Sequence, residues 1–273
     1  MPETVTATPS FADLLASAVT EPGRIHEAYT RFHNYSLGNQ LLAWAQCLER
    51  GLELGPMATY PAWQAMGRQV RKGAKAIVLC QPVTLRRTAV DAETGDETKV
   101  AFTRFTYRPK WFVLAQTEGQ AYEAPAPPAW DKATAFEALQ VAETPFTMAD
   151  GNCQGFARGR EVAVSPIAVV PFKTLVHELA HVVLGHTLEH TMVDGDTTAR
   201  DIREVEAEGV ALLVCGALSQ DGLEYCRGYI QHWLGERREI PERSAQRIFK
   251  AADTILRAGR EAAEQFEAEQ VAA

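Results

Sequence analysis

The chain has 273 residues, of which 46% are hydrophobic and 23% are charged, and its formal net charge is −8. This composition is normal for a globular protein that buries a core, and no apolar run approaches the roughly 20 residues that cross a bilayer. The first residues lack the basic flank and apolar stretch of a signal peptide. Five widely spaced cysteines without a C-x-x-C pair indicate free thiols, so we expect a cytoplasmic protein without a membrane partner.

The charges are distributed unevenly along the chain. Residues 1–120 carry 13 Lys and Arg against 11 Asp and Glu, whereas the remainder carries 14 against 24. Within 60–112 there are 10 basic and 4 acidic residues. A basic segment in an acidic protein suggests an anionic partner, although a solvated sheet face would give the same pattern.

The first half of the chain predicts helices followed by an antiparallel hairpin. Apolar residues recur at helical spacing in 37–50, and residues typical of strands flank an acidic turn at 91–96. We expect helices at 11–19, 37–50 and 61–68, and strands at 75–85 and 99–116.

A proline-rich segment at 118–132 separates the two halves. Its prolines remove backbone donors and favour an extended chain, so neither a helix nor a central strand fits there. We therefore expect one domain at 1–120, a linker at 121–132 and a second domain at 133–273.

The second half predicts helices packed on a small sheet. We expect helices near 131–142 and at 171–188, 198–218, 222–235 and 241–268, with short strands around 146–150 and 161–165. Together the two halves indicate an α+β protein of two domains, with N-terminal helices and a small antiparallel sheet in the first domain.

The segment VHELAHVVLGH at 176–186 contains an H-E-x-x-H motif. Residues four apart project from the same side of a helix, so His177 and His181 can bind one Zn²⁺ together. Glu178 lies one step round the helix, where it can activate a water at the metal without ligating the metal. A metal would also compensate the burial of these polar side chains in an apolar helix. A chance match on an amphipathic helix is the alternative.

The third ligand is expected from the segment DIREVEAEGVALLVC. On a continuous helix His186 would face away from the metal. Glu204 and Glu208 share one face of the predicted second helix, and Glu206 points nearly opposite. We predict that Glu204 ligates zinc and that Glu208 orients a ligating histidine, with Glu208 as the second choice for the ligand. A solvated acidic helix face is the alternative for these three glutamates.

This ligand set predicts a metallopeptidase of the glutamate-zincin type. Two neutral imidazoles and one carboxylate leave an open zinc position for water, and Glu178 would pass a proton from that water to the leaving amine. Tyr225, Tyr229 and His232 are candidate oxyanion donors by location, although packing is the alternative role of each. The strand at 161–165 could pair with an extended peptide substrate.

Several segments, in order along the chain, resemble ArdC-type antirestriction proteins. The single-stranded-DNA-binding domain of that family is similar to FHNYSLGNQLLAWAQ, ATYPAWQAMGRQVRKGAKAIVLCQPV and FVLAQTEG, at 32–46, 58–83 and 112–119. EVEAEGVALLVCGAL and YIQHW resemble the C-terminal helices of the family. The resemblance implies a mobile-element protein that binds DNA, protects it from restriction, and has a C-terminal zincin-like metallopeptidase fold with the H-E-x-x-H helix.

The resemblance also implies which residues contact single-stranded DNA. They are the residues of the matching motifs: Tyr35, Asn39, Gln40, Trp63, Arg68, Arg71, Lys72 and Lys75. Arg and Lys follow phosphates, and exposed aromatic rings such as Trp63, Phe105 or Tyr107 could stack on bases. Tyr35 and Asn39 could instead brace their helix, and Trp63 could lie in the core. Double-stranded DNA and a protein substrate are further candidate partners.

The motif layout also resembles the ImmA/IrrE peptidases, which cleave repressor-like regulators. Three functions therefore stay open. The first is an antirestriction protein with a DNA-binding domain and a metallopeptidase-like domain. The second is a regulatory zinc protease that cleaves a DNA-bound regulator, and the third is a DNA-binding protein with a structural zinc.

Overall fold

The computed structural model describes residues 9–90, 97–148, 153–188, 200–235 and 239–260. Helices and strands are mixed and include a small antiparallel sheet, which agrees with the expected α+β class. The chain forms two compact units: Leu42–Ala124 is the smaller, and Met1–Leu41 together with Pro125–Ala273 is the larger.

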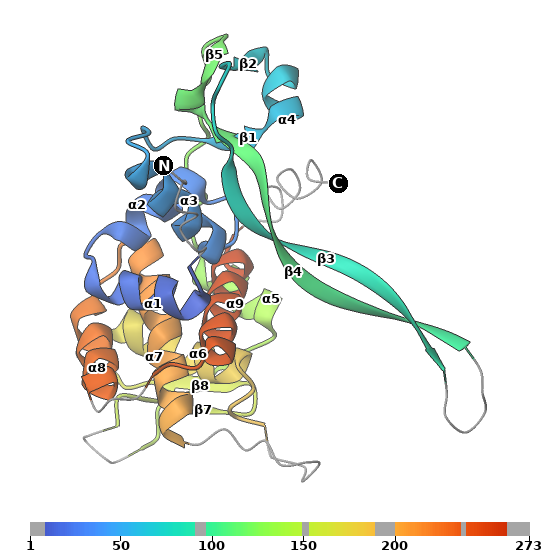
Figure 1. Ribbon diagram of the computed structural model, residues 1–273. Coiled ribbons are helices and arrows are strands. Elements are labelled where there is room, and N and C mark those ends of the chain that lie inside the picture. Colours follow the sequence, from blue (N-terminus) through green and yellow to red (C-terminus); the bar gives the residue numbers. More distant parts are fainter. Residues whose placement is uncertain (1–8, 91–96, 149–152, 189–199, 236–238, 261–273) are drawn as a thin grey trace. The chain divides into compact units, whose positions relative to one another are not determined.

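The smaller unit contains a long, twisted antiparallel ribbon (Figure 1). Strands β3 (Ile77–Val90) and β4 (Glu97–Val113) pair from one end to the other, and β1 (Met57–Thr59) pairs with the end of β4. The strand order is β1-β4-β3, and a second sheet joins β2 (Arg68–Val70) to β5 (Thr117–Gly119). The expected hairpin is therefore present, and β3 continues past its predicted end at residue 85.

A buried tryptophan lies on the short helix of this unit. Helix α4 (Tyr60–Ala65) has its proline in the first turn, where the missing N–H costs nothing. Trp63 is 0% exposed, and its indole N–H donates a hydrogen bond of 2.8 Å to the carbonyl of Phe112 on β4. Its ring also meets Tyr122 edge-on, with centroids 5.5 Å apart. Trp63 is therefore part of the core that joins α4 to the ribbon.

The larger unit is built around helix α7 (Arg200–Ala217), in which residues 205–217 are all buried. Two glycines allow close helix packing: a Cβ at Gly209 would lie 2.9 Å from Ile248, and one at Gly216 would lie 2.9 Å from Ile25. The surrounding helices follow in chain order: α5 (Lys132–Leu139), α6 (Pro171–Val183), α8 (Leu223–Gly235) and α9 (Glu242–Ala258).

The N-terminal helices pack in the larger unit rather than with the ribbon. These are α1 (Phe11–Thr20), α2 (Arg24–Phe32) and the first turns of α3 (Leu37–Glu49). The Glu242 carboxylate accepts hydrogen bonds of 3.2 and 3.0 Å from the N–H groups of Phe11 and Ala12, and Asp253 accepts one of 2.8 Å from Leu37 N–H. Carboxylates of α9 therefore cap the N-termini of α1 and α3.

This packing divides the chain differently from the predicted domains at 1–120 and 133–273. The carboxyl-side boundary of the smaller unit lies within the predicted linker, but the first 41 residues join the later unit. The reason is the apolar face of α2, which has Ile25, Ala28, Tyr29 and Phe32 at helical spacing and packs against α7. Helix α2 was not among the predicted helices, although this spacing is visible in the sequence.

A three-stranded sheet adjoins α6. Its order is β6-β8-β7, with β6 (Ala142–Glu143) parallel and β7 (Gly155–Arg158) antiparallel to β8 (Glu161–Val164). The strand predicted around 146–150 is wrong as far as the structure describes it, because 146–148 lies outside any strand. The peptide-pairing role predicted for 161–165 is also wrong, because both edges of β8 are already paired.

None of the described helices is long and apolar enough to cross a membrane. The five cysteines are free thiols, and Cys47, Cys80, Cys215 and Cys226 are buried.

Candidate metal centre

Helix α6 carries both histidines of the H-E-x-x-H motif on one side. The helix begins at Pro171 and ends at Val183, earlier than the predicted residue 188. The Nε2 atoms of His177 and His181 lie 3.1 Å apart. Two nitrogen lone pairs this close repel each other unless a proton or a cation lies between them. The pair is therefore suited to share an ion.

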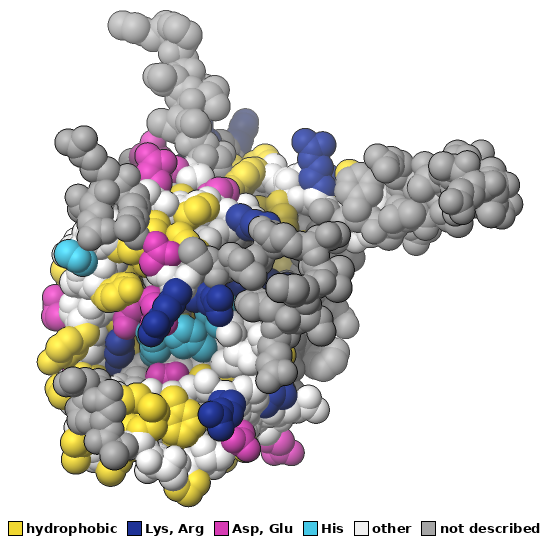
Figure 2. All heavy atoms as spheres, turned by 90° about the horizontal axis from the view of Figure 1, so that it is seen from below, with side chains coloured by type: hydrophobic (Ala, Val, Ile, Leu, Met, Phe, Trp, Pro, Cys, Tyr) yellow, Lys and Arg dark blue, Asp and Glu magenta, His cyan; other side chains and the backbone are white. Residues whose placement is uncertain are grey.

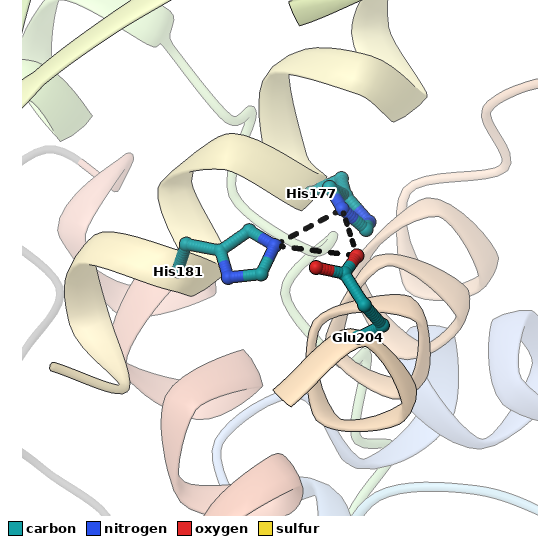
Figure 3. A group of neighbouring side chains, drawn as sticks. All are labelled: His177, His181 and Glu204. Atoms are coloured by element: carbon teal, nitrogen blue, oxygen red, sulfur yellow. Dashed lines mark hydrogen bonds and ion pairs between the residues drawn. The ribbon is translucent and has the colours of Figure 1, made fainter. Parts of the chain in front are cut away.

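Glu204 of α7 reaches the same point from the neighbouring helix (Figure 3). Its Oε2 lies 3.5 Å from Nε2 of His177 and 3.8 Å from Nε2 of His181. A tetrahedral zinc site with bonds near 2.1 Å has donor atoms about 3.4 Å apart. The three separations lie on both sides of this value, so the donor set fits a divalent ion.

Glu208 contacts the opposite side of the first histidine. Its Oε1 lies 3.2 Å from Nδ1 of His177 and 2.5 Å from Nζ of Lys173. Glu208 is thus placed to orient His177, whereas Glu204 faces both Nε2 atoms, so the geometry favours Glu204 over Glu208 as a ligand. Lys173 was not among the predicted site residues, although it precedes His177 by four residues on the same helix.

Burial alone would lower the pKa of His177, but the carboxylates of Glu204 and Glu208 raise this pKa to about 9. The neighbouring imidazoles of His177 and His181 hold the pKa of Glu204 well below its usual range. Burial would raise the pKa of Glu208, but His177 and Lys173 lower it to about 2. In the metal-free protein His177 therefore keeps a proton that an incoming ion must displace.

Glu178 is buried beside the histidines, and burial raises the pKa of its carboxyl despite the nearby imidazoles. Strand β7 passes very close to it: a Cβ at Gly155 would lie 3.0 Å from Glu178 Oε1 and 2.9 Å from the carbonyl oxygen of Ala163. Only glycine fits at position 155, and the side chain of Glu178 lies between the backbone of α6 and strand β7.

The chain turns back toward the site after α6. Gly185 has a φ of +77°, a conformation that favours glycine, and this turn brings the next residue, His186, back against the end of α6. His186 Nδ1 lies 3.0 Å from His181 Nδ1, and His186 Nε2 lies 2.9 Å from Glu206 Oε2. His186 lies outside the group of converging donors, as predicted, but it contacts the Nδ1 side of His181 because the helix does not continue to residue 186.

The three glutamates of α7 do not form a solvated acidic face. Glu206 is 1% exposed and Glu208 is 7% exposed. Glu206 points away from Glu204, as predicted, but toward His186 and Arg247, which lies 3.4 Å from it. The alternative of a solvated face is therefore wrong for this helix.

The candidate ligands lie in a cleft with a volume of about 810 Å³. Figure 2 shows histidine side chains in a hollow with Lys and Arg side chains beside it. Arg200, Arg203 and residues of β7 contribute to the lining, and Tyr225, Tyr229 and His232 do not. Burial and then the carboxylates of Glu204 and Glu208 raise the pKa of Tyr229, so this residue lies near the candidate ligands without lining the cleft, and the oxyanion role of the three residues stays a prediction.

The smaller unit carries some of the predicted DNA contacts on its surface. Arg71, Lys72 and Lys75 are exposed, whereas Arg68 donates hydrogen bonds to Thr117 Oγ1 and to the carbonyl of Gln120. The base contact predicted for Trp63 is wrong because its side chain is fully buried.

The aromatic candidates on β4 are accessible. Phe105 is 60% exposed and Tyr107 is 40% exposed. Residues two apart on a strand point to the same face, so the two rings form one exposed aromatic surface.

The remaining predicted DNA contacts belong to the larger unit. Tyr35 and Asn39 are half-buried. Gln40 is 1% exposed and donates a hydrogen bond of 2.7 Å to the carbonyl of Tyr35. The DNA contact predicted for Gln40 is therefore wrong, because its amide braces the start of α3.

The first part of the chain is similar to a known domain family. Residues 16–108 match the family model described as the N-terminal domain of anti-restriction factor ArdC. The fold is shared with the antirestriction protein ArdC of plasmid R388: its metal-free crystal structure is 21% identical with a TM-score of 0.51, over 91% of this chain and 94% of that one. Its Mn(II)-bound structure is 19% identical with a TM-score of 0.51, over 94% and 99%.

A curated relative extends the similarity along most of the chain. Protein y4eC of Sinorhizobium fredii is 26% identical over 250 residues, which cover 86% of this chain and 78% of y4eC. Residues 16–108 are therefore similar to the N-terminal domain of ArdC, and the chain shares its fold with ArdC of plasmid R388.

Proposed function

We propose that this chain is an antirestriction protein that binds single-stranded DNA and carries a metal-dependent peptidase centre of the glutamate-zincin type. The observation that carries the catalytic part is the convergence of His177 Nε2, His181 Nε2 and Glu204 Oε2 beside the buried carboxyl of Glu178. Two imidazoles and a carboxylate suit Zn²⁺. Because R388 ArdC has a Mn(II)-bound structure, Mn²⁺ should be tested as well as Zn²⁺.

A bound divalent ion would polarise a substrate carbonyl and make water a better nucleophile. Glu178 would accept a proton from that water and return it to the leaving amine. Its raised pKa suits this exchange, because a proton carrier works best when its pKa approaches the working pH. Glu208, fixed by Lys173, would hold His177 in its ligating orientation.

The edge of β7 is the proposed substrate-binding strand. β7 pairs with β8 on one side, and no strand of the described chain pairs with its other side. Gly155, Phe156 and Ala157 line the cleft. An extended peptide could add to this edge by main-chain hydrogen bonds, which would lay its backbone across the cleft.

DNA binding is assigned to the smaller unit. Its exposed cations Arg71, Lys72 and Lys75 can follow a phosphate backbone, and the exposed rings of Phe105 and Tyr107 can stack on bases. Stacking on unpaired bases is the reason for proposing single-stranded rather than double-stranded DNA.

The other two functions are less well supported. The ArdC match of residues 16–108 does not favour a regulatory protease of the ImmA/IrrE type. A purely structural metal is less consistent with the cleft, because structural zinc sites are closed by four protein ligands. The described residues supply three ligands that face an open cleft.

The catalytic part is tested with the full chain loaded with Zn²⁺ or Mn²⁺ and a set of quenched fluorescent peptides. Glu178→Gln should keep its metal and lose hydrolysis by about 10²-fold or more, and Glu204→Ala should lose the metal. Glu161→Gln, at an exposed glutamate on β8, is the matched control and should behave as wild type. Full metal occupancy in Glu204→Ala would contradict the ligand assignment.

The DNA part is tested with a fluorescent single-stranded oligonucleotide at several salt concentrations. Reversal of Arg71, Lys72 and Lys75 to glutamate should weaken binding and reduce its salt dependence. The control reverses three exposed cations of α9, at positions 243, 250 and 257, which changes the net charge equally. Equal affinity of both triple variants for the oligonucleotide would contradict the assignment of Arg71, Lys72 and Lys75 as DNA contacts.

The role of hydrolysis is separated from that of binding by measuring restriction protection in cells. Unchanged protection by Glu178→Gln would favour DNA binding without proteolysis. Lost protection with intact DNA affinity would favour cleavage of a protein substrate.

A further inference from the structure

A chain of buried polar groups leads from the second metal-ligand histidine to helix α9. His181 Nδ1 lies 3.0 Å from His186 Nδ1, and His186 Nε2 lies 2.9 Å from Glu206 Oε2. Arg247 Nη2 lies 3.4 Å from the same carboxylate oxygen and donates a hydrogen bond of 2.9 Å to the carbonyl of Leu184. The side chains of His186 and Glu206 are 4% and 1% exposed.

Which atom donates and which accepts in each hydrogen bond follows from the charges of Glu206 and Arg247. A carboxylate beside a guanidinium can only accept hydrogen bonds, so His186 must present an N–H at Nε2 to Glu206. Nε2 of His186 also lies 3.5 Å from Arg247 Nη2, which is consistent with two donors that converge on one oxygen.

The remaining nitrogen of His186 then acts as an acceptor. A neutral imidazole with its hydrogen on Nε2 has a lone pair on Nδ1. His181 must therefore donate from its own Nδ1, because two lone pairs facing each other at 3.0 Å would repel. This arrangement leaves the Nε2 lone pair of His181 directed at His177 and Glu204.

We propose that His186, Glu206 and Arg247 form a relay that fixes the tautomer and ring orientation of His181 and so prepares its Nε2 to ligate a metal. The relay rests on the proposed metal centre and adds three positioning residues to it. Metal-ligating histidines commonly donate their other N–H to a carboxylate directly. In this relay the imidazole of His186 lies between His181 and the carboxylate. The charges that orient His181 belong to Glu206 on α7 and Arg247 on α9.

His177, the other candidate ligand histidine, is oriented in a different way from His181. His177 is contacted directly by Glu208, which Lys173 neutralises. Glu206 and Glu208 point in different directions from α7, so each can be altered without removing the partner of the other. This separation allows the relay to be tested by itself.

The relay is tested in the full-length protein by Zn²⁺ affinity, measured by competition with a chelator at constant pH. Glu206→Gln and His186→Leu should weaken binding by about 10- to 100-fold, the range found when the partners of ligating histidines are removed. His186→Asn should recover part of the loss, because its amide oxygen can replace Nδ1 as an acceptor. Arg31→Gln, at an exposed cation of α2, is the control and should leave the affinity unchanged.

Tautomers provide a readout that does not depend on whether a variant folds. In the Zn²⁺-loaded wild type, two-bond ¹H–¹⁵N correlation spectra should show a hydrogen on Nδ1 of His181 and on Nε2 of His186. A hydrogen on Nδ1 of His186 would overturn the relay. Equal Zn²⁺ affinity of folded Glu206→Gln, folded His186→Leu and wild type would also overturn it and leave the metal centre intact. A wild type that binds neither Zn²⁺ nor Mn²⁺ would overturn the metal centre and the relay together.

Discussion

The raised pKa of His177 predicts that the metal-free protein loses stability as the pH rises from 6.5 to about 9. Burial opposes the protonated imidazole, but the carboxylates of Glu204 and Glu208 outweigh burial and raise its pKa to about 9. Because this value lies above the unfolded-state value of 6.5, the stabilisation is fully present below pH 6.5 and is lost as the pH rises through 9.

The magnitude follows from the difference between the two pKa values. At 1.36 kcal/mol for each factor of ten, a rise from 6.5 to about 9 corresponds to about 3 kcal/mol. The side chain of His177 is 15% exposed, so solvent screening removes little of this energy. The lowered pKa of Glu208 reports the same attraction from the other partner, and the two contributions are therefore not added.

The assay is denaturant unfolding of the metal-free chain in chelator at pH 6, 7, 8 and 9. The free energy of unfolding of the wild type should fall over this range relative to that of His177→Gln, which has no titrating imidazole at this position. An unchanged difference between the two proteins across the range would refute the reasoning.

Metal binding should show the opposite pH dependence. An ion needs neutral imidazoles, so each bound Zn²⁺ displaces the proton of His177. The apparent association constant should therefore rise by about tenfold for each pH unit up to about pH 9. Calorimetry in buffers of different ionisation enthalpy would count the released proton, and a count of zero would contradict the protonated state assigned to His177.

Three substitutions test other parts of the structure. Gly155→Ala should lower stability by about 1–3 kcal/mol and impair hydrolysis, because its Cβ would press on Glu178; thermal unfolding and peptide cleavage measure the two effects. Trp63→Phe should lower stability and leave the affinity of the folded protein for single-stranded DNA unchanged, because the indole is buried; weaker binding would return Trp63 to the DNA surface. Lys173→Met should cost about 1–3 kcal/mol in denaturant unfolding, because the buried Glu208 would keep only His177 as its partner, and a change below 1 kcal/mol would contradict this pairing.

Which polar side chains share a helix face could be predicted because this depends on periodicity within single helices. Spacings of four residues placed His177 with His181, and Glu204 with Glu208, without knowledge of the rest of the fold. The ribbon could also be predicted, because strand-forming residues flank the acidic segment at 91–96, which lies outside the described residues. These features need only local sequence, and the structure reproduces them within a few residues at each end.

The features that were missed depend on contacts between distant parts of the chain. The position of His186 depends on a helix that ends at Val183 and a turn at Gly185, and helix ends are poorly specified by sequence. The central position of β8 depends on which strands pair with it, which its own four residues do not encode. The burial of Trp63 depends on a carbonyl of β4 that is remote in sequence.

The three glutamates of α7 explain why the two central helices of the site require each other. Glu204, Glu206 and Glu208 lie within five residues, and each is directed to a different partner: the Nε2 pair, His186 with Arg247, and His177 with Lys173. A buried carboxylate without a partner costs several kcal/mol, so Glu206 and Glu208 would oppose folding without the histidines and cations opposite them. The histidines of α6 are equally costly to bury without these carboxylates. The polar groups that prepare the proposed metal centre therefore also specify how α6 packs on α7, and variants of the site should be compared for stability before they are compared for activity.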